Sequence, residues 1–349
     1  MNPVGKVDIR QTLRLRRRDK VRGATEETMT NKTRREFVKT AATAAAAGLA
    51  ASLLQVSPVN ANPLNLPIGL QLYTVGKEMD ADPAGTLRSV ARTGYKQVEL
   101  SPIGKTPAKE LKRMLDDNGL ANPSGHYMLS DLMSKLPEMI ELAHLFGQQF
   151  MVVTIPWVSD TSRFKVEPPD DQMALFLAVI RGLTLDDWKW NADEFNQIGE
   201  QIKKAGLQLA YHNHNFEWRT YDGVVAYDEF LKRTDPALVK LELDCGWAAV
   251  AGQDPTNYLT KYPERYNLLH LKDFHKGFTP RTAIRGERDT GPLEGTELGR
   301  GAIDYAKVLA AARRAKIRAQ FVEQEPPFTE MTALEAIKVN YEYLKNLKV

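Results

Sequence analysis

The order of hydrophobic and polar residues along positions 63–349 predicts alternating β-strands and α-helices. Short apolar runs mark eight strands, at residues 68–73, 96–100, 121–126, 149–155, 207–212, 239–244, 267–272 and 317–323. Apolar residues recur with helical spacing in six segments between them, at residues 83–93, 107–118, 132–146, 192–205, 226–233 and 305–315. A glycine suited to end a helix follows several of these segments, at Gly94, Gly119, Gly147 and Gly206.

This alternation predicts an α/β protein, and eight β–α units in roughly 290 residues fit a (β/α)8 TIM barrel. A doubly wound sheet is the competing architecture, but no Gly-x-Gly-x-x-Gly follows a predicted strand and no Walker-type phosphate loop occurs. Two connections are unusually long: residues 157–190, with an extra helix expected at about 171–181, and the glycine-rich residues 275–300. Long connections after barrel strands usually belong to the active site.

Charge is unevenly distributed along the 349 residues. The net charge is +3, but residues 1–62 hold 12 Lys and Arg against 5 Asp and Glu, whereas the remainder holds 35 against 39. A nucleic-acid-binding protein carries its basic groups on the folded domain, so this class is disfavoured. The single cysteine, Cys245, excludes an intramolecular disulfide and a cysteine-based zinc site.

The basic N-terminal region resembles a twin-arginine export signal. Its marker is Thr33-Arg-Arg-Glu-Phe-Val-Lys39, followed by an alanine-rich apolar stretch at 41–54 that is too short to span a bilayer. Val59-Asn-Ala61 fits a signal-peptidase site, and no later segment reads as a membrane helix. We therefore interpret residues 1–28 as a non-native or disordered extension, 29–61 as the signal peptide and 62–349 as the barrel, and we predict a periplasmic or secreted protein that engages the twin-arginine translocase.

Four metal-ligand candidates stand at or just beyond the ends of the last four predicted strands: Glu217, Asp244, His270 and Glu323. Because the C-terminal ends of barrel strands meet at one rim, these side chains are expected to converge. Three carboxylates in one cleft would repel each other without a cation. Such an oxygen-rich set predicts one divalent cation, with Mn²⁺ or Mg²⁺ favoured and Co²⁺ or Zn²⁺ also suitable.

Several sequence motifs, taken in order, resemble the xylose-isomerase-like TIM barrels, a family of sugar (phosphate) isomerases and epimerases that includes inosose dehydratase. They are Gly69-Leu-Gln-Leu-Tyr73, Val98-Glu-Leu100, Tyr211-His-Asn-His-Asn-Phe-Glu217, Leu241-Glu-Leu-Asp-Cys-Gly-Trp247, Ala251-Gly-Gln-Asp-Pro255, Leu269-His-Leu-Lys-Asp273, Glu297-Leu-Gly-Arg-Gly301 and Phe321-Val-Glu323. The resemblance covers residues 66–347 and implies the same four metal ligands, with Glu323 chosen over Glu325. It also implies that Glu217 and Glu323 form the acid–base pair that moves a proton between the two faces of a sugar.

One position departs from the epimerase pattern. Trp247 stands where the family has a substrate-binding histidine, and its apolar face suits a sugar ring or an aglycone, or plain packing beneath a loop. Lys272 follows the ligand histidine, as in the dehydratase-like branch, and could donate a proton, hold an oxyanion or form a salt bridge. The remaining candidates for contact with the substrate are His126, His212, His214 and Glu99, where His212 and His214 could instead support Glu217.

These observations together predict a metal-dependent sugar isomerase or epimerase that transfers a proton next to a carbonyl through an enediolate. The alternative is a metal-dependent carbon–oxygen lyase, a dehydratase or keto-glycoside eliminase, toward which Trp247 and Lys272 point. A non-catalytic sugar-binding protein is a third hypothesis, and the retained carboxylates count against it. The expected substrate is a small carbohydrate, no nucleic acid or stable membrane span is expected, and a homodimer is left open.

Overall fold

The computed structural model describes residues 62–101, 106–168, 171–284, 287 and 293–349. The predicted leader, its cleavage site and the extension before it lie outside these residues. Among the described helices, none combines the length and apolar character needed to cross a membrane.

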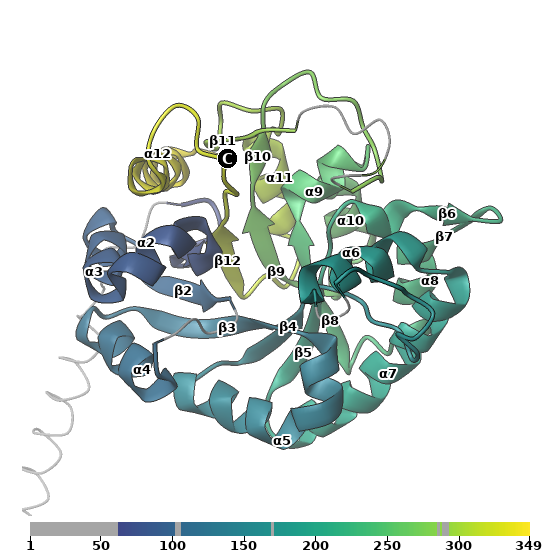
Figure 1. The fold of residues 1–349 in the computed structure, drawn as a ribbon. Helices are drawn as coiled ribbons and strands as arrows, with labels where there is room; N and C mark the ends of the chain where they lie inside the picture. Colours follow the sequence, from purple (N-terminus) through teal and green to yellow (C-terminus); the bar gives the residue numbers. More distant parts are fainter. Residues whose placement is uncertain (1–61, 102–105, 169–170, 285–286, 288–292) are drawn as a thin grey trace, which may run out of the picture. The chain divides into compact units, whose positions relative to one another are not determined.

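Eight parallel strands form a closed barrel, as the sequence predicts (Figure 1). The strands are β1 (Ile68–Gln71), β2 (Gln97–Leu100), β3 (Ala121–Tyr127), β4 (Phe150–Val153), β5 (Gln208–His212), β8 (Val239–Asp244), β9 (Tyr266–Leu271) and β12 (Ala319–Val322). Each strand pairs with the next of the eight along the chain, and β12 closes the ring on β1 through the register pair Gly69–Phe321. This is the (β/α)8 TIM barrel, and the doubly wound alternative is excluded.

The helices lie around the outside of the barrel, as Figure 1 shows for α3, α4, α5, α7 and α8. Their bounds are α2 (Gly76–Ala81), α3 (Pro83–Thr93), α4 (Ala108–Asp117), α5 (Leu129–Phe146), α6 (Gln172–Gly182), α7 (Leu185–Lys204), α8 (Ala226–Arg233), α9 (Cys245–Val250), α10 (Pro255–Lys261), α11 (Tyr305–Ala312) and α12 (Ala333–Asn346). Two 3₁₀ turns, η1 (Leu72–Val75) and η2 (Phe216–Trp218), and two short hairpins complete the fold: β6 (Thr220–Tyr221) with β7 (Val224–Val225), and β10 (Asp273–Phe274) with β11 (Gly295–Thr296).

Local capping explains several helix ends. The predicted glycines Gly94, Gly119, Gly147 and Gly206 all have positive φ, the conformation that glycine adopts at least cost. The α7 helix begins seven residues before the predicted position because Thr184 and Asp187 form a capping box at its start. The extra helix expected in the long fourth connection is α6, which Asp171 caps.

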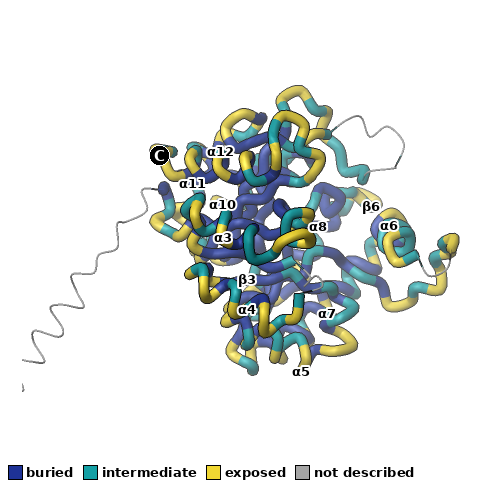
Figure 2. Tube along the Cα trace, turned by 60° about the vertical axis from the view of Figure 1, so that its left-hand side comes forward, coloured by how far each residue is buried: buried dark blue, intermediate teal, exposed yellow. Residues whose placement is uncertain are grey.

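The core has two parts, which appear as the dark interior of Figure 2. The larger part packs helices against the outer face of the strands, and a smaller group fills the barrel itself: Phe150, Val152, Ala210, Leu268, Ala319 and Phe321. Because strand residues alternate between the two faces, the next inward positions along β5, β9 and β12 are His212, His270 and, just beyond the strand, Glu323. The apolar plug therefore gives way to polar side chains at the C-terminal end of the barrel.

Candidate metal centre

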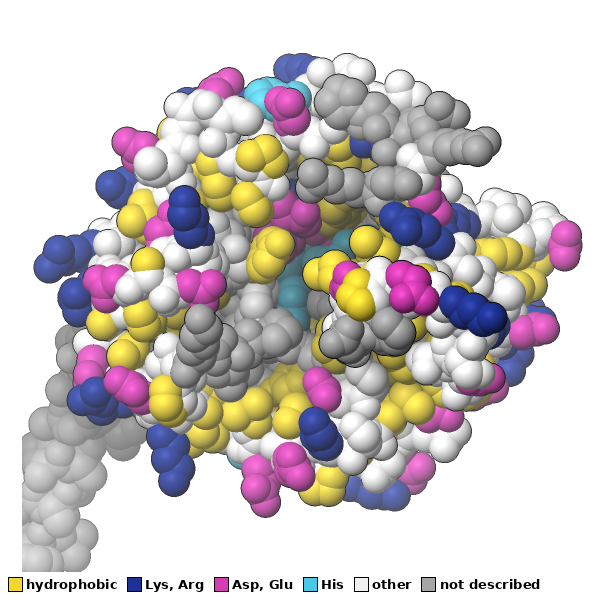
Figure 3. Space-filling view, in the orientation of Figure 1, with side chains coloured by type: hydrophobic (Ala, Val, Ile, Leu, Met, Phe, Trp, Pro, Cys, Tyr) yellow, Lys and Arg dark blue, Asp and Glu magenta, His cyan; other side chains and the backbone are white. Residues whose placement is uncertain are grey.

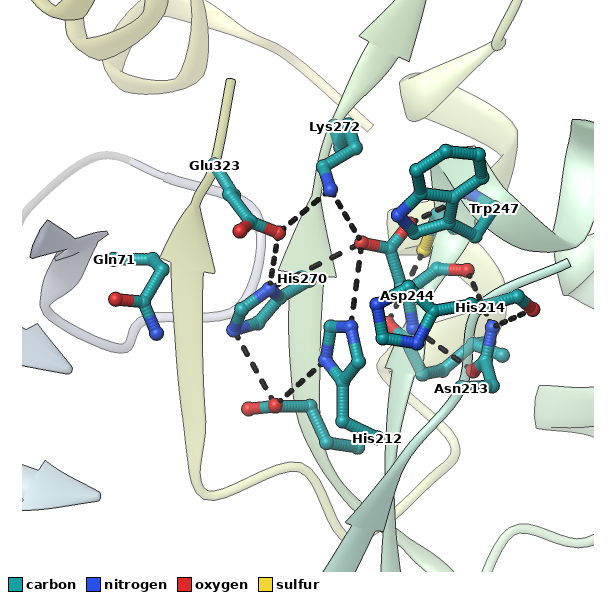
Figure 4. A network of polar contacts seen from close by, with 12 residues as sticks. Gln71, His212, Asn213, His214, Asp244, Trp247, His270, Lys272 and Glu323 are labelled. Carbon is teal, nitrogen blue, oxygen red and sulfur yellow. Dashed lines mark hydrogen bonds and ion pairs between the residues drawn. The ribbon is translucent and has the colours of Figure 1, made fainter. Parts of the chain in front are cut away.

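Four side chains at this end of the barrel form a group that could hold a metal ion: His212, Asp244, His270 and Glu323. One ligand atom from each lies within 4.8 Å of all the others, and all four residues are buried. His270 Nδ1 lies 2.9 Å from Glu323 Oε2 and 4.0 Å from Asp244 Oδ2, and His212 Nε2 lies 3.9 Å from the same Asp244 oxygen. Figure 4 shows these side chains pointing toward one another.

Asp244 is held in place by Asn213, which follows the neighbouring strand β5, and by the helix α9 that it caps. The Asn213 side chain accepts a hydrogen bond from the Asp244 backbone N–H at 3.1 Å and donates one to the Asp244 carbonyl at 3.2 Å. Asp244 Oδ1 caps α9 by accepting the Trp247 backbone N–H at 2.7 Å. Its other oxygen, Oδ2, is buried and accepts no hydrogen bond among the described residues, and its ion-pair partner Lys272 Nζ lies 3.4 Å away. A buried carboxylate oxygen left in this way fits a cation ligand.

A second pair of carboxylates, Glu99 and Glu242, lies on the opposite side of the two imidazoles. Glu242 Oε2 lies 3.0 Å from His212 Nδ1 and 3.3 Å from His270 Nε2, and Glu99 Oε2 lies 2.6 Å from the same His270 nitrogen. Each histidine therefore turns one ring nitrogen toward Asp244 and the other toward a carboxylate. Metal-binding histidines are commonly oriented in this way, because the carboxylate fixes the tautomer and the ring position.

His126 joins this supporting layer. Its Nε2 lies 2.9 Å from Glu99 Oε2 and 3.3 Å from Glu242 Oε2. A second possible ligand group also has one ligand atom from each residue within 4.8 Å of all the others; it consists of His126, His212, Glu242 and His270. That group uses the nitrogens of His212 and His270 that face away from Asp244, so we interpret it as the support of the first group.

Burial and neighbouring charges set the protonation of the two groups. Burial, reinforced by His270, lowers the pKa of His212 well below its usual range, which keeps the imidazole neutral as a metal ligand requires. Burial raises the pKa of Asp244 to about 6, and burial together with the Glu99 charge raises the pKa of Glu242 to about 7. Burial acts against the charge of Glu323, but Lys272 and His270 hold its pKa well below its usual range.

Lys272 is a buried cation at the edge of the metal group. Its Nζ lies 2.8 Å from Glu323 Oε2, 2.6 Å from Glu325 Oε1 and 3.4 Å from Asp244 Oδ2. Burial opposes its charge, but these carboxylates raise its pKa well above the usual range. Lys272 is therefore a charged donor that bridges a candidate ligand, Glu323, to Glu325, whose side chain is partly exposed in the neighbouring cavity.

Glu217 lies just beyond the end of β5, as predicted, but away from the candidate ligand group. It lies on η2, beyond the end of β5, and is not part of either group found among the described residues. Its Oε1 accepts a 2.7 Å hydrogen bond from Tyr211, whose ring packs among the outer aromatic residues Phe195 and Phe230. Burial raises the pKa of Glu217 to about 7. His212, the last residue of β5, points inward and belongs to the candidate ligand group, whereas the 3₁₀ turn directs Glu217 to the Tyr211 hydroxyl on the outer side of the strand.

The other predicted residues lie in or beside the same region. His214 stacks on Phe216, and its ring centroid lies 5.8 Å from that of Trp247. Trp247 itself packs against Phe274 at 5.2 Å, and Lys272 Nζ lies 5.1 Å from its ring centre. Glu99 and His126 belong to the supporting layer described above.

Sequence analysis missed two residues of this site. Glu242 precedes Asp244 by two positions on β8, so the period-two alternation of strand residues places both on the inner face and could have found it. Gln71 ends β1 and donates a 2.9 Å hydrogen bond to Glu99 Oε2; it stands inside the motif Gly69–Tyr73, but the sequence analysis gave its side chain no role.

A cavity of about 500 Å³ opens beside the metal group. In Figure 3, histidine and acidic side chains are visible at the bottom of a central hollow that hydrophobic side chains border. Its described lining includes His214 and Glu325, which brings the cavity to the edge of the polar centre. The cavity therefore lies beside the metal group at the C-terminal end of the barrel, the end at which TIM barrels bind substrates.

Comparisons with curated proteins return inosose dehydratases. The enzyme of Clostridium beijerinckii is 30% identical over 67% of this chain and 78% of its own length. That of Clostridium tetani is 27% identical over 54% of this chain, and the match spans 63% of the length of that relative.

Comparisons with solved structures return the same architecture. A sugar phosphate isomerase/epimerase from Parabacteroides distasonis is 25% identical with a TM-score of 0.59, over 81% of this chain and 96% of that structure. The IolI protein with a bound zinc atom is 13% identical with a TM-score of 0.58, over 79% and 96% of the two chains, and shows a shared fold. Residues 87–346 match the family described as the xylose isomerase-like TIM barrel. This chain therefore belongs to the xylose isomerase-like TIM barrel family.

Proposed function

We propose that this protein is a divalent-metal-dependent carbon–oxygen lyase that acts on a cyclic keto-polyol. The observation that carries the proposal is the position of Glu217. A two-glutamate epimerase needs a carboxylate on each face of the sugar, but Glu217 bonds to Tyr211 and His212 takes its place beside Asp244. The similarity to inosose dehydratases supports the same conclusion, because those enzymes remove water from a keto-cyclitol.

The proposed ligands are His212, Asp244, His270 and Glu323. Two imidazoles and two carboxylates form a more nitrogen-rich set than the sequence predicted, and this set suits Mn²⁺, Co²⁺ or Zn²⁺ better than Mg²⁺. When bound, the cation polarises the substrate carbonyl and makes the adjacent C–H more acidic.

The chain itself supplies the proton transfers. Glu325 borders the cavity and accepts a hydrogen bond from Lys272 at 2.6 Å, so it is the carboxylate placed to take the proton from the carbon next to the carbonyl. Lys272 holds Glu325 and Glu323 in position and is the nearby donor for the oxygen that leaves. Loss of that oxygen as water or alcohol leaves an unsaturated ketone.

The test is incubation of the full chain with Mn²⁺ and 2-inosose in D₂O, followed by NMR and mass spectrometry. A lyase gives a product lighter by one water, and Asp244→Asn should abolish its formation. Lys272→Met should lower the rate by about 100-fold or more, whereas Lys276→Met, an exposed control four residues further along the chain, should not. An epimer that has lost no water and differs from the substrate only by deuterium taken up next to the carbonyl would instead support the isomerase hypothesis.

A further inference from the structure

The cavity beside the metal group has an apolar compartment. Its walls come from α6, α9, β10 and two connections, through the side chains of Phe176, Ile180, Trp247, Phe274, Ile284 and Pro326. These six side chains offer almost no hydrogen-bonding groups, whereas the polar groups of the cavity come from the rest of its lining: His214, Asn215, Arg281, Glu294 and Glu325. The hydroxyl groups of a polyol ring would lose their water there without replacement, which is unfavourable.

The compartment is continuous with the metal group through Trp247. The backbone N–H of this residue binds the candidate ligand Asp244, while its ring packs on Phe274 in the cavity wall. Its indole Nε1 is buried and has no hydrogen-bond partner among the described residues. Trp247 therefore marks the boundary between the polar centre and the apolar walls, with a donor available for a ligand oxygen at that boundary.

The size of the cavity also exceeds what a small polyol needs. A cyclitol has about 12 non-hydrogen atoms, whereas cavities of about 300–1,000 Å³ hold drug-sized ligands. At about 500 Å³, this cavity has room for a sugar ring near the metal group and for a second ring between the apolar walls.

We propose that the apolar compartment binds an aromatic or similarly apolar group that is attached through oxygen to the keto-sugar and leaves during the reaction. This inference rests on the proposed lyase function and names its substrate class, a keto-glycoside with an apolar aglycone. A proton leaves the carbon next to the carbonyl, its electron pair forms a C=C bond, and the C–O bond to the aglycone breaks. The departing oxygen gains one proton, so the products are an unsaturated keto-sugar and a phenol or alcohol, with no net oxidation.

Binding of glycosides that lack the ketone, and so cannot react, tests the compartment directly. With the Mn²⁺-loaded full chain, calorimetry should show phenyl β-D-glucopyranoside binding at least about tenfold more tightly than methyl β-D-glucopyranoside. Phe176→Ala should remove most of this difference and leave methyl glucoside binding unchanged. Met173→Ala is the matched control, because Met173 lies on the same helix with 66% of its surface exposed and outside the cavity lining.

Equal binding of the two glucosides, or equal effects of Phe176→Ala and Met173→Ala, would overturn the inference. This result is distinguishable from a failure of the lyase proposal. Dehydration of 2-inosose together with equal glucoside binding would retain the lyase and remove the apolar compartment. Aryl preference that Phe176→Ala abolishes, without elimination from 2-inosose, would support the compartment and place the fault in the proposed reaction.

Discussion

Replacing His212 by alanine tests which residue near the end of β5 completes the metal group. The change removes Nε2, which lies 3.9 Å from Asp244 Oδ2, and leaves Glu217 in place. Glu217→Gln is the matched variant, because it neutralises the other buried candidate, five residues further along the chain, while keeping the shape of its side chain. We expect His212→Ala to weaken metal binding and Glu217→Gln to leave it nearly unchanged.

The size of the effect follows from the ligand count. Residues that only support metal ligands contribute about 10–100-fold in affinity, so loss of one of four ligands should cost at least about 100-fold. At a free metal concentration of about 1,000 times the wild-type Kd, bound metal stabilises the folded chain by about 4.1 kcal/mol. A 100-fold weaker site retains about 1.4 kcal/mol of this, a loss of about 2.7 kcal/mol. For a barrel of this size, that loss lowers the metal-dependent rise in Tm by about 4 °C.

Differential scanning calorimetry in EDTA and in excess Mn²⁺ measures this rise for each variant. Each variant is compared with itself, with and without metal. The stability that His212→Ala loses with the contact to Glu242 is present in both measurements and cancels in the difference. Metal content after dialysis provides an independent measurement. The reasoning fails if Glu217→Gln loses the metal-dependent rise in Tm while His212→Ala keeps it, because the ligand set would then be the one first predicted.

Three further predictions concern support, charge and capping. Glu242→Gln should weaken metal binding by about 10–100-fold in a chelator titration, because it removes the charge that orients His212; unchanged affinity would contradict this role. Burial raises the pKa of Glu217 to about 7, so the folded chain still holds a proton there at pH values where the unfolded chain has released it. The folded state is therefore favoured by this group at low pH, and that contribution is lost as the pH rises through 7. Between pH 5 and 8 in EDTA, the wild type should therefore lose on the order of 2–3 kcal/mol more than Glu217→Gln in urea unfolding, and parallel pH profiles would refute the shift. Thr332→Ala should cost about 0.5–2 kcal/mol in the same assay, since Thr332 caps α12, while Thr332→Ser should cost less.

The sequence by itself was sufficient for the architecture. Each predicted strand is present within a few residues, because a barrel strand buried on both faces must be an almost continuous apolar run, as in Phe150–Val153. Helix ends were recognisable where one residue type has a conformational advantage, as Gly147 does in the left-handed region. The expected convergence of Asp244, His270 and Glu323 also followed from the topology, since the ends of parallel barrel strands share one rim.

The tertiary structure decided which residue near the end of β5 joins that convergence. His212 and Glu217 are both polar and close in sequence, but strand alternation turns His212 inward, and the following 3₁₀ turn carries Glu217 to the Tyr211 hydroxyl. The supporting layer of Glu99, Glu242 and His126 likewise joins three different strands across the barrel. The sequence determines the period and the burial of each segment, but the direction of a side chain beyond a strand end depends on contacts with residues distant in the chain, and these exist only once the barrel closes.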